Sequence, residues 1–261
     1  MPHRGDTMVK ANNHIHSEFS WDSRMSIDEI AKILRNANIR YGTITDHIEF
    51  NQEACSYALT KLEIRKLALE ATNKIEKGNV TLLSGVEISE PHQYKDKVSS
   101  LKSVGLDSVY GSIHNFINCA QTESDIKFAY RKYYDEILKM IDADQIDVVA
   151  HLDYINRYYD KDYSDMSQVR EVLQALIEKD MALEINTSAK RRTQIKLAKY
   201  DIFPTIDKLE MYFDLGGEKI VIGSDAHKIS ELTDNLDITE KYPILKQKKI
   251  GIYKQRKFEI I

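Results

Sequence analysis

Short apolar runs that end on histidine or a carboxylate recur along the whole chain, and this pattern limits the fold more than any other feature. Seven such runs are strand-like, because they are short, apolar or β-branched, and bounded by polar residues or glycine. They cover residues 9–14, 41–45, 80–86, 107–113, 146–150, 181–185 and 219–223. Segments of helical period separate them. This alternation predicts a closed or nearly closed parallel α/β barrel, with an open parallel sheet as the alternative.

The helical segments carry recognisable end signals. Ser26 is followed three residues later by Glu29, which is the pattern of a capping box at a helix start. Similar amphipathic spacing covers residues 58–77, 122–141 and 166–179. Pro204 is expected in the first turn of a helix that runs to about Leu215 and is ended by the two glycines that follow.

Length and composition predict one soluble domain over residues 1–261. The chain is 42% hydrophobic and 30% charged, which supplies a full core. The N-terminal residues 1–8 are expected to be disordered or tag-like. The basic tail, residues 246–261, is expected to form a peripheral cap on the barrel. Two cysteines, no signal-peptide pattern and no long apolar stretch favour a cytoplasmic protein that is not bound to a membrane.

The net charge of −4 argues against a polyanionic partner. Binding to nucleic acid requires a basic face, and the overall charge balance does not supply one. We therefore predict a small-molecule substrate rather than a nucleic acid.

The residues that follow the apolar runs are those that bind metal ions. The carboxyl ends of parallel strands meet at one mouth of a barrel, so side chains far apart in sequence are expected to converge there. The residues at these positions are His14, His16, His47, Glu87, His114, His151, Asp225 and His227. A single histidine at a strand end is usually a satisfied polar group, but the joint pattern predicts a multinuclear site. Imidazole and carboxylate without thiolate suit Zn, Mn or Fe and leave room for water.

The ordered motifs resemble the polymerase-and-histidinol-phosphatase (PHP) superfamily. They are His-X-His, Asp-His, GVE, SIH, AHLD and SDAH, and they extend from about Asn12 to His227. HIHSEFSWDS, HLDYINRY and EINTSAKRR further resemble the histidinol-phosphate phosphatase branch. The resemblance implies a distorted seven-stranded barrel with its metal site at the C-terminal mouth of the strands.

The resemblance also implies two to three divalent ions and their ligands. The first ion would take His14, His16, Glu87 and Asp225. The second would share Glu87 and add His114 and His151. The third would take Asp22, His47 and His227, although Asp22 could instead be a loop residue or a helix cap.

Three further polar residues fall near these ligands. Asn12 stands where the family usually has an aspartate, and it could hydrogen-bond in its place with less basicity. Asp46 and Asp153 are interpreted as partners that orient ligands rather than as ligands.

The activity that the resemblance implies is hydrolysis of L-histidinol phosphate in histidine biosynthesis. A metal-bridging hydroxide would be the nucleophile, and no side chain is predicted to act as one. Neither a P-loop motif nor a G-x-S-x-G motif is present. The alternatives are another PHP hydrolase, acting on a nucleotide phosphate or a phosphodiester, and a metal-binding protein without enzymatic activity.

Candidates for phosphate and substrate binding follow from position. Arg157 comes six residues after His151, and a basic loop follows the sixth predicted strand; such arginines can hold phosphoryl oxygens, or they can be solvated loop charges. The basic loop contains Lys190, Arg191 and Arg192. Glu18 and Glu49 are acidic candidates for a cationic substrate. Phe19, Tyr154 and Tyr158 could pack on its ring, or simply at the barrel rim.

Overall fold

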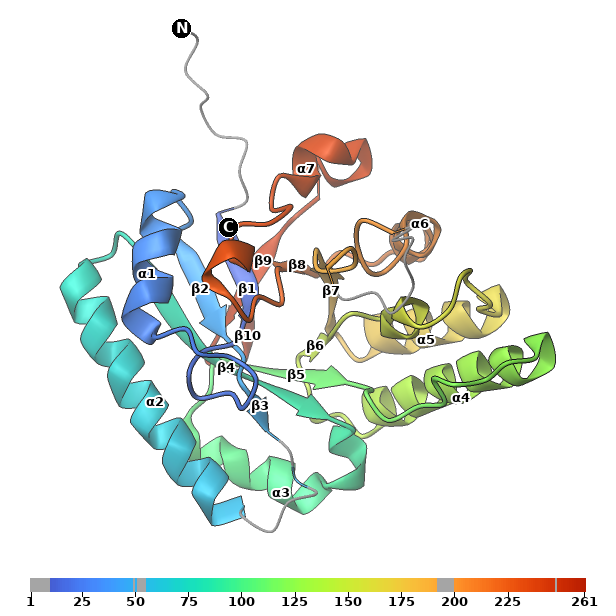
Figure 1. Cartoon of the computed structure of the whole chain (residues 1–261), viewed down its shortest axis with the longest axis horizontal. Helices are drawn as coiled ribbons and strands as arrows, with labels where there is room; N and C mark the ends of the chain where they lie inside the picture. The colour runs from blue at the N-terminus through green and yellow to red at the C-terminus, as the bar shows by residue number, and fades with distance from the viewer. Residues whose placement is uncertain (1–9, 49, 51–54, 192–199, 247) are drawn as a thin grey trace, which may run out of the picture.

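Seven parallel strands form a nearly closed barrel with helices around it (Figure 1). The computed structural model describes residues 10–48, 50, 55–191, 200–246 and 248–261. The strand order is β1-β2-β4-β5-β6-β7-β8. At the carboxyl ends of the strands the first and last strands meet, since Ile15 pairs with Ala226 and the His16 amide donates to the Ala226 carbonyl at 2.9 Å. The predicted barrel is confirmed, and the open-sheet alternative is wrong.

All seven predicted strands are present, with ends shifted by at most three residues. The barrel strands are β1 (Ala11–Ile15), β2 (Tyr41–Ile44), β4 (Thr81–Ser89), β5 (Ser108–Ser112), β6 (Val148–Val149), β7 (Ala182–Asn186) and β8 (Ile220–Gly223). A further short strand, β3 (His47–Ile48), was not predicted. It pairs with the end of β4, where His47 lies directly beside Glu87. Two residues are too few to give a periodic signal in the sequence.

The helices lie outside the barrel, with α1 and α2 along one side and α4, α5 and α6 along the other (Figure 1). Their bounds are α1 (Ile27–Asn36), α2 (Cys55–Glu76), α3 (Lys95–Ser100), α4 (Glu123–Asp142), α5 (Met166–Glu178), α6 (Ile206–Asp214) and α7 (Ile238–Lys241). Single 3-10 turns are η1 (Pro91–Gln93), η2 (Leu101–Val104), η3 (Tyr154–Arg157), η4 (Ile229–Glu231) and η5 (Pro243–Leu245). The capping box of Ser26 and Glu29 at the start of α1 is confirmed.

The prediction that Pro204 opens a helix is wrong. Helix α6 begins at Ile206 with Thr205 as its N-cap, so Pro204 lies outside it, after a cis peptide bond. Both backbone polar groups of Phe203 hydrogen-bond to Asn186 of β7, at 2.7 and 2.9 Å. This isolated bridge holds Phe203 against β7 just before the helix.

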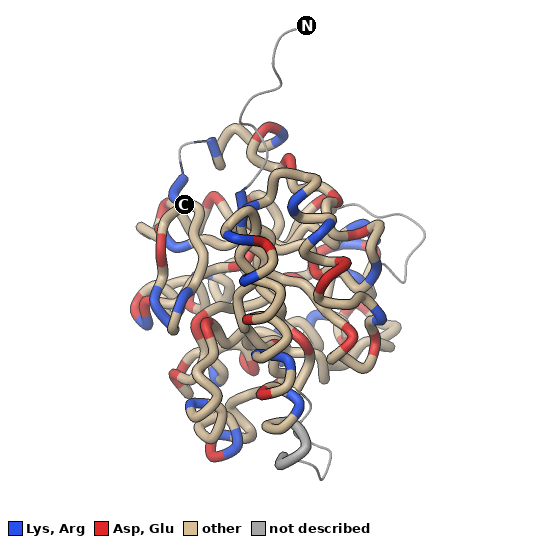
Figure 2. Tube along the Cα trace, turned by 90° about the vertical axis from the view of Figure 1, so that its left-hand side faces the viewer, with Lys and Arg blue, Asp and Glu red and all other residues tan. Residues whose placement is uncertain are grey.

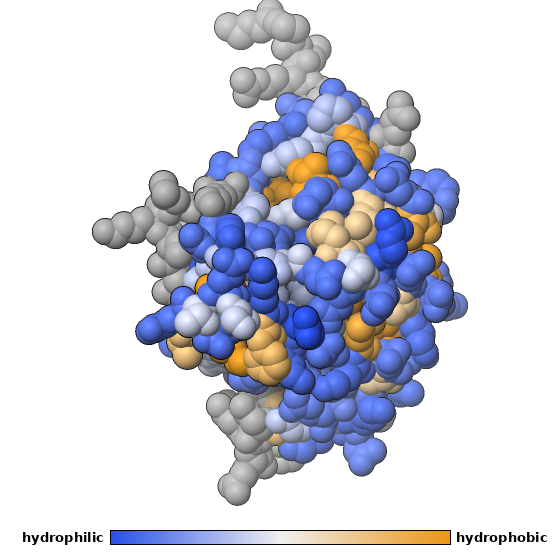
Figure 3. All heavy atoms as spheres, turned by 90° about the vertical axis from the view of Figure 1, so that its right-hand side faces the viewer, coloured by the Kyte–Doolittle hydropathy of each residue, from blue (hydrophilic) through white to orange (hydrophobic). Residues whose placement is uncertain are grey.

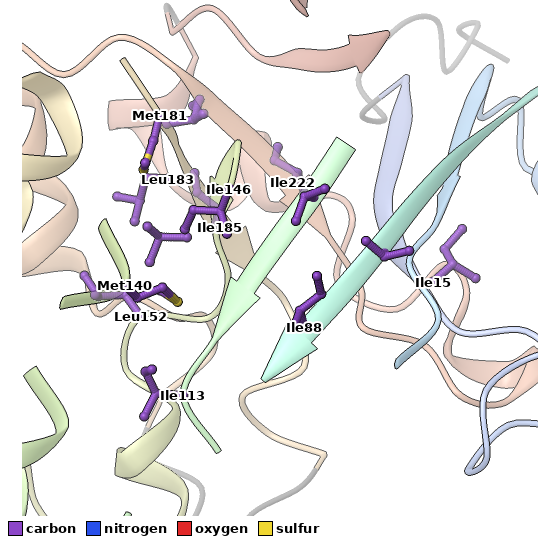
Figure 4. Close-up of a cluster of buried hydrophobic side chains, with 14 of the residues drawn as sticks. Ile15, Ile88, Ile113, Met140, Ile146, Leu152, Met181, Leu183, Ile185 and Ile222 are labelled. Atoms are coloured by element: carbon purple, nitrogen blue, oxygen red, sulfur yellow. The ribbon is translucent and has the colours of Figure 1, made fainter. Parts of the chain in front are cut away.

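The alternation of side chains along the strands divides the core in two. Outward residues such as Ile88, Leu183 and Ile222 are buried against the helices, together with Met140 of α4 (Figure 4). Inward residues fill the barrel below its mouth: Tyr110, Val148, Ala150, Ala182 and Val221. The mouth of the barrel therefore rests on a packed floor rather than on a channel.

The C-terminal tail forms a hairpin of β9 (Gly251–Lys254) and β10 (Lys257–Ile260). Its inner strand is buried: Ile252 and Tyr253 join the core, and Tyr253 packs with the barrel interior. The Tyr253 hydroxyl donates to the Asp147 carbonyl at 3.1 Å, and the Gln255 amide donates to Asp107 at 3.0 Å. Both acceptors directly precede strands, so the hairpin covers the barrel end opposite the mouth.

The surface is polar, with charges of both signs interspersed. Figure 2 shows Lys and Arg mixed with Asp and Glu over the face that carries α2. Figure 3 shows the opposite side as mainly hydrophilic, with separate small apolar patches. Within the described part of the chain, no helix is both long and apolar enough to cross a membrane.

Candidate metal centre

The predicted histidines and carboxylates converge at the carboxyl ends of the barrel strands. They come from six strands and the loops that follow them: His14 from β1, His16 and Asp22 after β1, His47 from β3, Glu87 from β4, His114 after β5, His151 after β6, and Asp225 and His227 after β8. Three overlapping groups can be distinguished, and within each group the ligating atoms lie within 4.8 Å of one another. The groups are His14, His16 and Glu87; His47, Glu87 and His114; and His16, Asp22, His47 and His227. Residues spread over more than 200 positions thus form one cluster.

Glu87 lies at the centre of this cluster and is almost fully buried. Its Oε1 is 2.8 Å from His151 Nε2 and 3.5 Å from His114 Nε2. Its Oε2 is 3.1 Å from His14 Nε2 and 3.4 Å from His16 Nε2. His47 Nδ1 also lies 3.4 Å from Oε2. One carboxylate therefore faces imidazoles from four strands or the residues just after them, which is the arrangement that a bridging ligand requires.

Asp22 and Asp225 extend the cluster toward the pocket rim. Asp225 Oδ1 is 3.3 Å from His16 Nε2, on the same side as His14. Asp22 Oδ2 is 2.8 Å from His227 Nε2 and 3.7 Å from His47 Nε2. The structure thus brings Asp22 next to the two histidines with which it was predicted to act.

The surroundings of His14 fit a bound cation. His14 Nδ1 donates to Glu184 Oε1 at 2.7 Å, and its Nε2 faces His16 Nε2 and Glu87 Oε2, each at 3.1 Å. Burial would lower the pKa of His14, but the charges of Glu184 and Glu87 raise it well above its usual value, so positive charge on this ring is favoured. A metal ion held at Nε2 would supply that positive charge in place of the second proton. The donor set is nitrogen and carboxylate oxygen, as Zn, Mn and Fe prefer.

Burial and neighbouring charge shift the pKa values of these groups in opposite directions. Burial alone would raise the pKa of Glu87, but the nearby charge of His14 and hydrogen bonds with His14 and His151 hold it well below its usual value. Burial lowers the pKa of His47 to about 4 and that of His114 to about 3. At neutral pH Glu87 is therefore ionised, and these two imidazoles are neutral with lone pairs available for a metal ion.

A pocket of about 330 Å³ opens over the cluster. It is lined by Trp21, Asp22, His47, Glu87, Ser89, His114, Asn115, His151, Tyr154 and Asp225. Candidate metal ligands form its floor, and two aromatic rings stand in its walls. Such a pocket gives a small molecule direct access to any ion held by the cluster.

Comparison with known proteins identifies the family. A sequence model of the PHP domain matches residues 12–188. The chain belongs to the PHP domain family. The chain is 31% identical over 232 residues to a protein of Clostridium acetobutylicum named probable histidinol-phosphatase, covering 83% of this chain and 86% of the relative. A protein of Thermotoga maritima with the same name is 28% identical over 216 residues, covering 82% of this chain and 83% of the relative.

The fold of this PHP domain also matches solved structures. The crystal structure of histidinol phosphate phosphatase from Lactococcus lactis, complexed with Zn, L-histidinol and phosphate, superimposes with a TM-score of 0.73 at 22% identity. The match covers 95% of this chain and 98% of the other. The predicted family and barrel are both confirmed.

Glu184 is a buried residue of this PHP domain that sequence reasoning missed. It lies on β7 and points into the barrel, where Oε1 accepts from His14 Nδ1 at 2.7 Å and Oε2 accepts from the His151 amide at 2.7 Å. One carboxylate thus fixes the tautomer of a β1 histidine and the backbone at the end of β6. Carboxylates that hold the second nitrogen of a ligating histidine orient it and raise its basicity.

Space for Glu184 depends on a glycine in the neighbouring strand. A Cβ on Gly223 of β8 would lie 2.3 Å from Glu184 Oε1 and 2.4 Å from the His14 Cβ. The nearer atom, Glu184 Oε1, is held in place by its hydrogen bond with His14 Nδ1. Glycine is therefore required here for close approach.

Replacing Glu184 by glutamine should weaken zinc binding about 10- to 100-fold. The carboxylate accepts from three donors, His14 Nδ1, the His151 amide and Asn186 Nδ2, whereas an amide has a single acceptor oxygen. The affinity can be measured by competition with a chromophoric chelator. Glu76→Gln is the matched control, since Glu76 is also buried but pairs with Arg35 on the helix layer at 2.7 Å. Wild-type affinity in the Glu184 variant would contradict this role.

Two candidate ligands of the PHP domain have left-handed backbone conformations that non-glycine residues rarely adopt. His151 has a φ of 26° and Asp225 a φ of 52°. Hydrogen bonds hold both: the His151 amide donates to Glu184, and the Asp225 amide donates to the His14 carbonyl at 2.8 Å. Strain of this kind persists only where the surroundings fix the backbone, and it is concentrated at functional sites.

Asp46 and Asp153 were interpreted as partners of ligands, and this interpretation is wrong for the imidazoles. Asp46 accepts from the amide and hydroxyl of Ser17, at 2.5 and 2.8 Å, and from Arg65 at 3.0 Å. Asp153 accepts from Tyr134 and Lys208. Asp46 therefore binds Ser17 and Arg65 of α2, and Asp153 binds Tyr134 of α4 and Lys208 of α6, instead of an imidazole.

Asn12 likewise has a structural role rather than contact with an imidazole. Its Nδ2 donates to Ser224 Oγ at 2.7 Å and to the Leu232 carbonyl at 2.9 Å, and its Oδ1 accepts from the Ser224 amide at 3.0 Å. It ties β1 to the turn after β8. Asn12 therefore holds Ser224, the residue directly before the candidate ligand Asp225.

The candidates for phosphate and substrate binding have different environments in the structure. Arg157 is buried and donates to Ser188 Oγ at 2.5 Å and Asp225 Oδ2 at 3.3 Å. Lys190 pairs with Asp201, and Arg191 pairs with Glu231 at 2.9 Å. Glu18 is exposed and is not among the residues that line the pocket. Arg192 and Glu49 lie outside the described residues.

Proposed function

We propose that this protein is a metal-dependent phosphomonoesterase that hydrolyses L-histidinol phosphate to L-histidinol and phosphate. The observation that carries the proposal is the buried Glu87, faced by imidazoles from four strands beneath an open pocket. The names of the relatives from Clostridium acetobutylicum and Thermotoga maritima support histidinol phosphate as the substrate.

The distances support an assignment of ligands to two or three divalent ions. Each ion takes residues that already lie together: His14, His16, Glu87 and Asp225 for the first; Glu87, His114 and His151 for the second; Asp22, His47 and His227 for the third. Zinc, manganese and iron all suit these donors. When bound, such ions lower the pKa of water and neutralise charge on a phosphoryl group.

The protein's own residues would orient the ligands and supply positive charge. Arg157 contacts one member of the cluster, since its Nη2 lies 3.3 Å from Asp225 Oδ2. Within the described structure, its Nε and Nη1 atoms have no hydrogen-bond partner, although the side chain is buried. Arg157 stands behind Asp225 and Tyr154 rather than in the pocket wall, with its Cζ 4.5 Å from the centre of the Tyr154 ring. Its positive charge would attract a phosphoryl group bound at the cluster, although the side chain of Asp225 lies between the two.

The testing experiment is phosphate release after reconstitution with Zn, Mn or Fe. Histidinol phosphate is compared with nucleotides, sugar phosphates and phosphodiesters. We expect a kcat/KM on histidinol phosphate of about 10⁴ M⁻¹s⁻¹ or more. Chelation should abolish the activity, and His14→Ala should do the same. Weak, unselective release from every monoester, or preference for a nucleotide or a diester, would overturn the substrate assignment.

A further inference from the structure

Trp21 is an exposed aromatic residue at the rim of the pocket. It is the one tryptophan of the chain, and 67% of it is accessible to solvent. The side chain lines the pocket together with Asp22, its neighbour in sequence. A large aromatic ring left in water beside a catalytic pocket loses apolar burial that it could otherwise gain, and such rings commonly mark binding sites.

The loop that carries Trp21 is held firmly to the candidate metal centre. Ser20 Oγ donates to Asp22 Oδ1 at 2.9 Å, and Ser23 Oγ donates to the carbonyls of His16 and His227 at 2.9 and 3.2 Å. Arg24 Nη1 donates to the Trp21 carbonyl at 3.3 Å. The ring therefore projects from a fixed loop, which lowers the entropy that a ligand must overcome on contact.

The ring is placed to contact whatever extends from a phosphoryl group on the cluster. It lies nearly parallel to His47, with an interplanar angle of 28° and 6.2 Å between ring centres. Tyr154 on another wall is less available, because the Arg157 guanidinium already covers its ring and His114 lies 5.0 Å away. Trp21 thus offers the more open aromatic surface within reach of the substrate.

We propose that Trp21 is a specificity residue that stacks on the planar ring of the leaving group. The inference rests on the proposed function and deepens it: a phosphomonoester held at the cluster places its alcohol portion in the pocket, beside Trp21. An imidazole ring there replaces water on the indole face. A substrate without a ring gains nothing from this contact, so Trp21 selects aromatic amino-alcohol phosphates.

Kinetics on two substrates test the contact. L-Alaninol phosphate is the same amino-alcohol ester without the imidazole ring. Trp21→Ala should raise the KM for histidinol phosphate about ten-fold with kcat nearly unchanged, because the lost contact is present equally in ground and transition states. The KM for alaninol phosphate should stay within about two-fold, and Trp21→Phe should restore most of the histidinol phosphate KM. Phe128→Ala, which removes another exposed aromatic ring on α4, is the matched control.

Fluorescence provides a readout that does not require turnover. Since the chain has one tryptophan, its emission reports on this residue alone. Titration with L-histidinol should change the emission saturably, whereas L-alaninol should not. Calorimetry on Trp21→Ala should show weaker L-histidinol binding, matching the KM change.

The outcomes separate the two proposals. Hydrolysis of histidinol phosphate with an unchanged KM in Trp21→Ala would overturn the ring contact and leave the proposed function intact. Failure of the wild-type protein to hydrolyse histidinol phosphate would overturn the proposed function. In that case the titration decides the ring contact: an emission change with L-histidinol alone supports it, and no change, or an equal change with L-alaninol, refutes it.

Discussion

Replacing Glu87 by glutamine should lower the rate of phosphate release by about a thousand-fold or more. Each metal ion contributes several kcal/mol of charge stabilisation in phosphoryl transfer, and Glu87 faces imidazoles of more than one ion's ligand set. Glutamine keeps the shape of the side chain and removes its negative charge. The imidazoles around it then lack the anion that makes a shared divalent site favourable.

Metal content and unfolding should change together in this variant. Metal analysis should show less than one ion per chain at a free-metal level that fills the wild-type protein. A chelator should lower the Tm of the wild-type protein, because ligands that bind the folded state stabilise it, and should leave the Tm of Glu87→Gln unchanged. Glu76→Gln, the same substitution at a buried site on α2, should keep both metal and activity. Full activity in Glu87→Gln would remove the central element of the proposed site.

The sequence predicted the site well because its chemistry follows strand ends. A histidine or carboxylate after an apolar run is placed at the barrel mouth by topology alone, whatever its neighbours are. This is why Glu87, His114 and His151 could be predicted to meet, although 64 positions separate the first from the last. The barrel itself was predicted from strand-like apolar runs that alternate with segments of helical period.

Residues whose role depends on a particular neighbour could not be predicted in this way. Glu184 stands inside an apolar strand and has its role because Gly223 leaves room beside His14. Asp46, beside His47 in sequence, contacts Arg65 of α2 instead of an imidazole. In the sequence Trp21 is only a residue between two predicted elements, and its place in the lining of the pocket is known from the structure alone. Such facts depend on which strands and helices face each other, and no local pattern encodes that.

Asp153 leads to the second large effect, because it belongs to a buried polar network away from the metal ligands. Lys208 of α6 is fully buried and donates to Asp153 and Asp162, and also to Ser164 Oγ at 2.9 Å and Tyr134 Oη at 3.0 Å. The network joins α4, α6 and the turn that follows His151. Burial would lower the pKa of Lys208, but the charges of Asp153 and Asp162 raise it above its usual value. The lysine therefore stays protonated at neutral pH.

Replacing Lys208 by methionine should lower the free energy of unfolding by about 3–5 kcal/mol, because Asp153 would keep a buried charge without its counter-ion. Urea unfolding should show a lower midpoint with an unchanged slope. Lys219→Met is the matched control: Lys219 pairs with Asp180 at 2.6 Å near the surface, so its loss should cost less than about 1 kcal/mol. Equal stability of the two variants would show that the buried network contributes no more than a surface ion pair.

The pH dependence of stability gives this prediction a second test. Burial would raise the pKa of Asp162, but the charge of Lys208 holds it below its usual value of 3.8. A lowered carboxyl pKa stabilises the fold above the unfolded value, and that contribution is lost as the pH falls through the folded value. The raised pKa of Lys208 stabilises the fold below 10.5 and is lost only at still higher pH. The difference in stability between wild-type protein and Lys208→Met should therefore be largest near neutral pH and shrink as the pH falls into the acidic range, where the carboxyl groups become protonated.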